Sequence, residues 1–224
     1  MIAHGKDDFL EKRIVKYDEW LEDAQISFSS KVIPISESFD AKQWVLPSEQ
    51  AEEIVRNAQF IAVQNCECRS HYKRCDHPLE VCLLFDEVGS KLVSRNEARR
   101  ISFDESKQIL KEADDSGLIH LALYMPDHKI YALCSCCTCC CHELQIVKLY
   151  DRPDLLVQSD YVAVTDIDLC IQCGDCVDRC PFEARTLEKD EMKYNDDMCL
   201  GCGLCVSVCP AEATSMVLRS NSNS

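Results

Sequence analysis

Two segments of the chain repeat with a period of 29 residues, and cysteine dominates both. Residues 168–187 (DLCIQCGDCVDRCPFEARTL) and 197–216 (DMCLGCGLCVSVCPAEATSM) are identical at ten of twenty positions, and each contains C-x2-C-x2-C-x3-C-P. Three thiols at this spacing can surround one metal centre from a single tight loop. Zinc sites instead combine cysteine pairs separated by a longer spacer, so the repeat favours iron–sulfur centres over zinc.

The segment of about residues 160–219 closely resembles the bacterial-type two-cluster [4Fe–4S] ferredoxins. The resemblance implies a βαββαβ module in which the cysteine before each proline ligates the cluster of the other repeat. Carried over by position, one cluster has the ligands Cys170, Cys173, Cys176 and Cys209, and the other has Cys199, Cys202, Cys205 and Cys180. Such clusters pass single electrons, so the resemblance implies electron transfer.

Ten further cysteines lie upstream in two groups: Cys66, Cys68, Cys75 and Cys82, then Cys134, Cys136, Cys137, Cys139, Cys140 and Cys141. The four thiols of the first group are enough for a [4Fe–4S] cluster or for structural zinc, and unligated redox-active thiols are a third possibility. The six thiols of the second group cannot all reach one cubane cluster, because adjacent residues of an extended segment point to opposite faces. A subset would therefore be ligands.

Both upstream groups follow a predicted strand. Residues 60–64 (FIAVQ) lead to Cys66, and residues 129–133 (KIYAL) lead to Cys134. If these strands pair, their Cys-x-Cys units meet at one sheet edge. Ten reduced thiols without a metal would be exposed to oxidation. We therefore expect at least one further iron–sulfur centre that draws on both groups, with zinc as the less favoured occupant.

The paired upstream cysteines also resemble the subunit of heterodisulfide reductases that builds noncubane clusters from Cys-Cys-Gly motifs. Thr138 and His142 follow the pairs in this chain, so that chemistry is not carried over. The layout as a whole resembles Cys-rich proteins of anaerobes that place an extra cysteine domain ahead of a two-cluster ferredoxin. That resemblance implies electron transfer rather than a particular reaction.

The fold class predicted from hydrophobic patterns is α+β, with a small sheet and helices ahead of the ferredoxin-like module. Helices are expected over 7–24, 49–58, about 103–115 and 141–150, and a hairpin is expected from strands 118–124 and 129–133. Ser102 and Glu105 form a predicted capping box, and Gly117 ends that helix. The expected organisation is a helix and connector over 1–45, a Cys-rich domain over 46–158, the ferredoxin-like domain over 159–219 and a tail over 220–224.

Single charged and histidine residues give weaker signals. Arg69 and the other basic residues between Cys68 and Cys82 favour a solvated loop, or alternatively a surface for an acidic partner or anionic substrate. His120 lies in an apolar strand and is expected in the core. His142, in the first turn of a helix, is expected to be a surface or packing residue rather than a ligand.

Charge and hydropathy limit the partners. The chain has 24 Lys and Arg against 39 Asp and Glu, a net charge of −15, which disfavours nucleic acid and favours redox partners with a basic docking face. No apolar run approaches the roughly 18 residues of a membrane span. The polar start, MIAHGKDDFLEKR, lacks a signal-peptide core, so a cytoplasmic location with reduced thiols is expected.

The function predicted from these features is single-electron transfer through [4Fe–4S] clusters, as a soluble component of anaerobic redox metabolism. One alternative is a redox enzyme whose upstream centre binds substrate and receives electrons from the ferredoxin-like module. Another is a thiol- or metal-handling protein that uses the cysteines from Cys134 to Cys141 as a thiol store.

Crossed ligation gives the first testable prediction. Cys180→Ser is expected to damage the cluster of the second triplet, Cys199 to Cys205, and Cys209→Ser the cluster of the first, because each lies in the other repeat's ligand set. Electron paramagnetic resonance of the reduced variants reports which cluster is lost. Loss of the cluster belonging to each residue's own repeat would contradict the two-cluster assignment.

Overall fold

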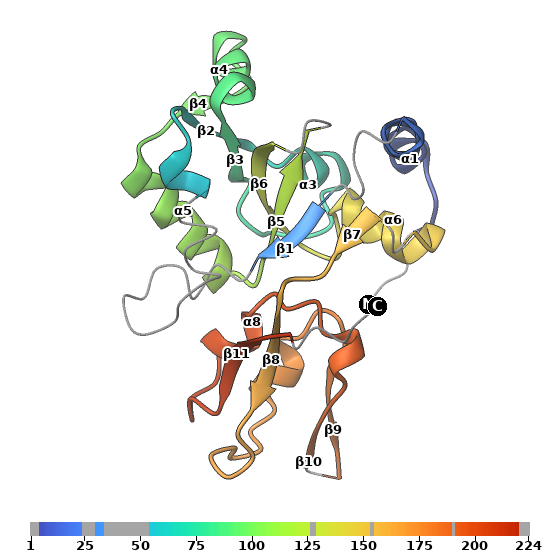
Figure 1. Ribbon diagram of the computed structural model, residues 1–224, viewed down its shortest axis with the longest axis vertical. Helices are drawn as coiled ribbons and strands as arrows, with labels where there is room; N and C mark the ends of the chain where they lie inside the picture. Colours follow the sequence, from blue (N-terminus) through green and yellow to red (C-terminus); the bar gives the residue numbers. More distant parts are fainter. Residues whose placement is uncertain are drawn as a thin grey trace.

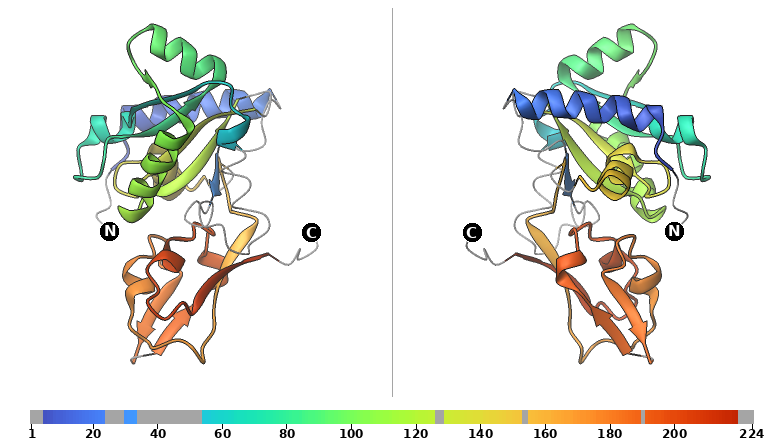
Figure 2. Two further views of the ribbon diagram at one scale, coloured as in Figure 1. Left: turned by 90° about the vertical axis from the view of Figure 1, so that its left-hand side faces the viewer. Right: turned by 90° about the vertical axis from the view of Figure 1, so that its right-hand side faces the viewer.

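The computed structural model describes residues 5–23, 30–33, 54–125, 129–152, 155–189 and 191–219. These residues form mixed helices and sheets in two parts, one above the other in Figures 1 and 2. The predicted connector beyond Ile33, the start of the helix expected over 49–58, the turn at 126–127, the break at 153–154 and the tail over 220–224 lie outside the described residues.

The upper part is built on one seven-stranded sheet. Its order is β4 (Arg99–Arg100), β2 (Ile61–Asn65), β3 (Glu80–Phe85), β6 (Ile130–Cys136), β5 (Ile119–Tyr124), β1 (Ser30–Ile33) and β7 (Leu156–Val157). Neighbouring strands are antiparallel, except that β1 and β7 are parallel. The sheet is larger than the small sheet predicted from the sequence. Its edge strands β4 and β7 have two residues each, which is too short for a recognisable hydrophobic pattern.

The hairpin predicted from 118–124 and 129–133 is confirmed, because β5 and β6 pair directly. The two strands that lead to Cys66 and Cys134 do not pair with each other, so the condition considered for their meeting is not met. Strand β3 lies between β2 and β6 and is antiparallel to both. Strands β2 and β6 therefore run in the same direction, and their carboxyl ends lie along the same side of the sheet. Cys82 on β3 pairs with Cys134 on β6.

The two longest helices begin at side-chain caps. Helix α1 (Asp8–Glu22) begins after Asp7, whose carboxylate accepts hydrogen bonds from the N–H groups of Phe9 and Leu10. Helix α5 (Phe103–Asp115) begins after Ser102, which accepts from the Glu105 N–H at 3.1 Å. The Glu105 carboxylate pairs with Arg99 instead of returning to Ser102, so half of the predicted capping box is present.

The segment between Cys68 and Cys82, for which the sequence favours a solvated loop, begins inside a helix. This is α3 (Glu67–Tyr72), which starts directly after Cys66. Helix α4 (Asp86–Ser94) follows β3, and helix α6 (His142–Tyr150) follows Cys141, close to the predicted range. Alternate strand residues bury opposite faces of the sheet. Val63 and Leu83 pack toward α5, whereas Ala62 and Leu84 pack toward α4 and α6.

The lower part contains two antiparallel pairs of strands. Strand β8 (Tyr161–Thr165) pairs with β11 (Thr214–Leu218), and β9 (Arg185–Glu188) pairs with β10 (Glu191–Tyr194). Helices α7 (Asp175–Asp178) and α8 (Leu204–Ser207) and the 3-10 turn η3 (Asp196–Met198) connect them.

The two parts pack directly against each other. The α8 residue Leu204 is buried in the same apolar cluster as Ile119 of the large sheet. The Arg179 guanidinium donates hydrogen bonds to the carbonyl oxygens of Asp114 and Asp115 at the end of α5. These contacts fix the lower part beneath the sheet.

Candidate metal centres

Four cysteines of the lower part line one small cavity: Cys170, Cys173, Cys176 and Cys209. The first three come from the loop between β8 and α7 and from α7 itself, and the fourth follows α8. A second cavity is lined by Cys180, Cys199, Cys202 and Cys205. Each cavity thus takes three cysteines from one repeat and one from the other.

The two glycines of the repeats give both loops the same turn. Gly174 and Gly203 precede α7 and α8 with φ of 86° and 78°, a left-handed conformation that glycine adopts without steric cost. The turn directs the next cysteine, Cys176 or Cys205, inward at the start of its short helix, where it is buried.

A buried arginine lies between the two cavities. The Arg185 side chain is 2% exposed. Its Nη1 atom lies 3.9 Å from the Cys176 sulfur and donates to the Thr165 hydroxyl at 2.6 Å. Burial lowers the pKa of the guanidinium, but the nearby Cys205 and Cys176 thiols more than offset this and raise it overall. Arg185 therefore places a permanent positive charge where thiolate sulfur from both repeats converges.

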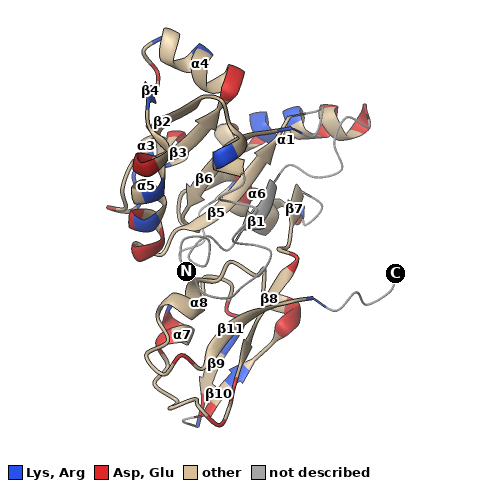
Figure 3. Cartoon of the chain, turned by 60° about the vertical axis from the view of Figure 1, so that its left-hand side comes forward, with Lys and Arg blue, Asp and Glu red and all other residues tan. Residues whose placement is uncertain are grey.

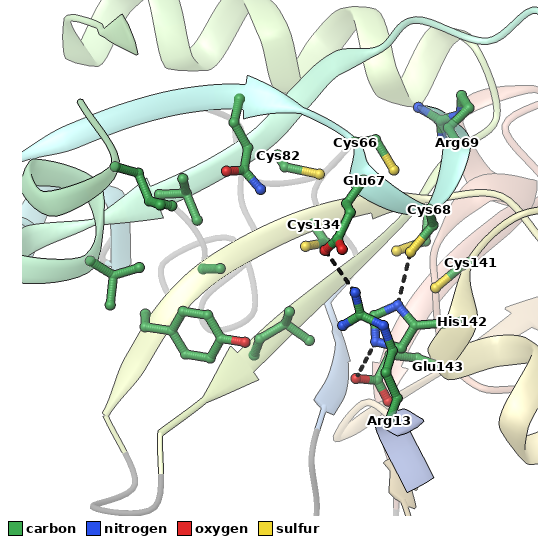
Figure 4. Close-up of a pocket in the computed structure, with 18 of the residues that line it drawn as sticks. Arg13, Cys66, Glu67, Cys68, Arg69, Cys82, Cys134, Cys141, His142 and Glu143 are labelled. Atoms are coloured by element: carbon green, nitrogen blue, oxygen red, sulfur yellow. Dashed lines mark hydrogen bonds and ion pairs between the residues drawn. The ribbon is translucent and has the colours of Figure 1, made fainter. Parts of the chain in front are cut away.

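Upstream, seven cysteines from both sequence groups line a cavity of about 240 Å³ beside the sheet edge. We call it the six-cysteine cavity after six of them: Cys66, Cys68, Cys82, Cys134, Cys136 and Cys141. The seventh, Cys137, also lies within a second, compact group of cysteines. The side chains of Cys66, Cys68, Cys82, Cys134 and Cys141 lie around one space (Figure 4). The cavity has room for several atoms, since one water occupies about 30 Å³ of liquid. A set of six thiols around such a space suits a polynuclear metal–sulfur centre better than one ion.

The thiols of this cavity interact with one another. Hydrogen bonds with Cys68 and Cys82 lower the pKa of the Cys66 thiol to about 2, whereas the same contact with Cys66, together with burial, raises the pKa of Cys68. Hydrogen bonding to Cys134 and to Cys66, with full burial, raises the pKa of Cys82. The three sulfurs are therefore close enough to hydrogen-bond to one another, and Cys66 is the most readily ionised of them.

One wall of the cavity carries a polar network that the sequence did not reveal. His142 Nδ1 lies 2.8 Å from the Cys68 sulfur, and His142 Nε2 lies 2.8 Å from the Tyr17 hydroxyl. The Tyr17 hydroxyl also donates to the Glu143 carboxylate. His142 is thus a buried residue that links a candidate ligand to α1. Tyr17 is part of the hydrophobic pattern that predicts a helix over 7–24. Its position in the sequence therefore gave no sign of a separate polar role.

Four cysteines lie close together just outside the cavity: Cys75, Cys137, Cys139 and Cys140, with Cys137 lining the cavity as well. Arg69 is 1% exposed and approaches this group, with Nη2 3.6 Å from the Cys137 sulfur and 3.2 Å from the Ser135 carbonyl oxygen. The solvated-loop interpretation of Arg69 is therefore wrong, because the guanidinium is buried and donates hydrogen bonds to the Pro78 and Ser135 carbonyl oxygens.

His120 lies in the core, as predicted. It is 1% exposed, and its Nδ1 atom lies 3.1 Å from the Ser135 hydroxyl. Burial lowers its pKa to about 3, so the imidazole is neutral and is not a charged participant in either upstream site.

Comparison with known proteins agrees with this donor chemistry. Residues 169–213 match the family described as 4Fe-4S dicluster domain. No curated protein matches the chain. The dicluster domain suggests iron–sulfur electron transfer, and together with the Cys-rich site it points to iron–sulfur clusters. Among the described residues, no helix has both the length and the hydrophobicity to cross a bilayer.

Arg185 gives a prediction for the dicluster domain. Arg185→Met is expected to lower the reduction potentials of the dicluster domain by about 100 mV. The reason is that a cation a few ångströms from a cluster favours its reduced, more negative state by about 2–3 kcal/mol. Anaerobic spectroelectrochemical titration measures the shift.

The control is Lys193→Met, an exposed cation on β10 that pairs with Glu191. It should leave the potentials nearly unchanged. Equal shifts in the two variants would mean that the potentials respond to overall charge rather than to the buried position of Arg185.

Proposed function

We propose that the chain is an electron-transfer protein in which a ferredoxin-like βαββαβ module over 159–219 holds two [4Fe–4S] clusters and serves a further iron–sulfur centre in the Cys-rich domain over 46–158. The observation that carries the proposal is the grouping of the lower cysteines into two sets of four, each shared between the repeats. Four thiolates are the donor set of a [4Fe–4S] cluster, which supplies one-electron redox chemistry.

The proposed ligands of the first cluster are Cys170, Cys173, Cys176 and Cys209, and those of the second are Cys199, Cys202, Cys205 and Cys180. Support for the module comes from the order β8, α7, β9, β10, α8 and β11 along the chain.

The further centre is proposed in the six-cysteine cavity. Cys202, a ligand proposed for the second cluster, packs against the apolar cluster that contains Cys136 and Cys141. Phe182 and Leu200 pack there as well. The second cluster site and the cavity therefore contact the same apolar cluster, which favours electron transfer between them. The first cluster site includes the exposed Cys173.

The exposed end offers a surface for a redox partner. Ile167, Leu169 and Ile171 flank Cys170 and are exposed, although they are apolar. Exposed carboxylates at Asp166, Asp168 and Asp175 surround them, and Figure 3 shows acidic positions on α7 beside this loop. A small apolar patch ringed by acids fits a transient partner with a basic docking face.

A redox enzyme is the second candidate, and the cavity itself favours it. Arg13, Lys16 and Arg69 line the same space as the six thiols, with the Tyr17, His142 and Glu143 network on one wall. Cations with hydrogen-bonding groups could bind a small anionic substrate next to a metal centre. In that case the dicluster domain would supply its electrons.

Metal content tests the further centre. The chain purified without oxygen is expected to contain clearly more than about 8 iron and 8 sulfide per molecule, the content of two cubane clusters. Cys82→Ala should remove only the iron and sulfide in excess of that content, since Cys82 is buried and lines the upstream cavity. Cys173→Ser is the matched control and should affect the dicluster share. A wild-type content of about 8 irons would contradict the further centre.

Salt dependence tests the partner surface. Electron transfer to a basic redox protein is expected to slow several-fold between about 20 and 500 mM salt, because screening weakens attraction between charged surfaces. Stopped-flow kinetics gives the rate. Asp168→Asn should reduce the low-salt rate, whereas Glu97→Gln on the distant α4–β4 connection should not. A wild-type rate that does not vary with salt would argue against electrostatic docking.

A further inference from the structure

The four cysteines beside the upstream cavity lie at distances that discriminate between a cluster and a single ion. Sulfur–sulfur distances are 3.7 Å for Cys75 and Cys137, 3.8 Å for Cys75 and Cys140, and 3.8 Å for Cys139 and Cys140. All four sulfurs lie within 4.8 Å of one another. With a Zn–S bond of about 2.3 Å, the edge of a regular tetrahedron of sulfurs is about 3.8 Å.

A cubane cluster needs a wider arrangement. Each of its thiolates binds a different iron, so the ligand sulfurs stand further apart than around one ion. Within the described residues, no other group of three or more cysteine, histidine or carboxylate ligands is as compact. The two quartets of the dicluster domain do not form such groups, although they occur in the same structure. The compact quartet therefore differs in kind from the cluster sites.

The backbone holds this quartet in place. Cys137, Cys139 and Cys140 come from one tight turn, in which the Cys137 carbonyl oxygen accepts hydrogen bonds from the N–H groups of Cys140 and Cys141. Cys75 comes from the segment after α3, where Lys73 ends the helix with φ of 50°. The site thus joins two segments separated by more than sixty residues. Helix α3, which directly precedes the first segment, and Cys137 in the second both line the six-cysteine cavity.

The surroundings match the charge of a divalent ion with four thiolates, which is −2. Arg69 approaches the Cys137 sulfur, and Arg74 donates to the Cys139 carbonyl oxygen at 3.2 Å and to the Gln145 side chain at 2.9 Å. Two guanidinium groups next to the site offset its charge. No open coordination position remains once four thiolates bind, which is the form of a structural zinc site.

We propose that Cys75, Cys137, Cys139 and Cys140 bind a single zinc ion, separate from the iron–sulfur centres. The ion fastens the segment after α3 to the turn at 137–140, and so ties α3 to the turn that contributes Cys137 to the six-cysteine cavity. The ten upstream thiols are then divided between a four-ligand ion site and a six-thiol cavity. This proposal is independent of whether the cavity holds a cluster.

The test is elemental analysis together with X-ray absorption of the full chain purified without oxygen. The wild type is expected to contain about one zinc per chain, with four sulfur neighbours at about 2.3 Å. Cys139→Ser should lose the zinc and keep its iron and sulfide. Cys136→Ser, which changes a neighbouring cavity thiol, is the matched control and should keep the zinc.

The wild-type absorption spectrum decides the matter even if Cys139→Ser does not fold. Zinc absent from the wild type, or zinc bound by nitrogen and oxygen, would overturn the proposal. Loss of iron and sulfide in equal numbers from Cys139→Ser would show that the quartet holds a cluster instead. A loss of iron and sulfide confined to Cys136→Ser bears on the cavity centre alone and leaves the zinc assignment supported.

Discussion

The position of β3 between β2 and β6 is the constraint on which the upstream sites depend. Because β3 is antiparallel to both neighbours, β2 and β6 run in the same direction and end at one sheet edge. Cysteines that follow strands far apart in the sequence therefore meet there. The pairing of Cys82 with Cys134 places a further thiol in the same wall. A one-residue shift of β3 would turn Cys82 to the opposite face and remove it from the cavity.

Buried arginines lie beside the cysteine sulfurs in both parts of the structure. Arg69 lies beside the upstream quartet, and Arg185 lies between the two cavities of the lower part. Arginine keeps its charge at every relevant pH, so these positions give a constant field. Each guanidinium also donates hydrogen bonds to oxygen, which fixes its place next to sulfur.

The sequence predicted the parts of the structure that depend on local spacing. The α1 stripe, the Ser102 cap, the β5–β6 hairpin and the burial of His120 follow from residues near one another in the chain. The 29-residue repeat predicted iron–sulfur chemistry for the segment that matches the 4Fe-4S dicluster domain. Spacing could not show that β3 separates β2 from β6. An apolar run such as EVCLLF predicts a buried strand, but it does not indicate which strands lie beside it or in which direction they run. Nor could it divide ten thiols between two sites, since that division depends on which turn each cysteine occupies.

Burial differs between the two cysteine quartets of the lower part, and if both hold clusters as proposed, this difference affects how each is filled. Cys173 is exposed in the folded chain, so iron and sulfide could reach the first quartet after folding. Cys199 and Cys205 are buried, and Cys202 packs with Leu204 against the large sheet. Cys180 and Cys202 are only partly exposed. A cluster in the second quartet would therefore lie behind the contact between the two parts, and opening of that contact would control both its assembly and its loss.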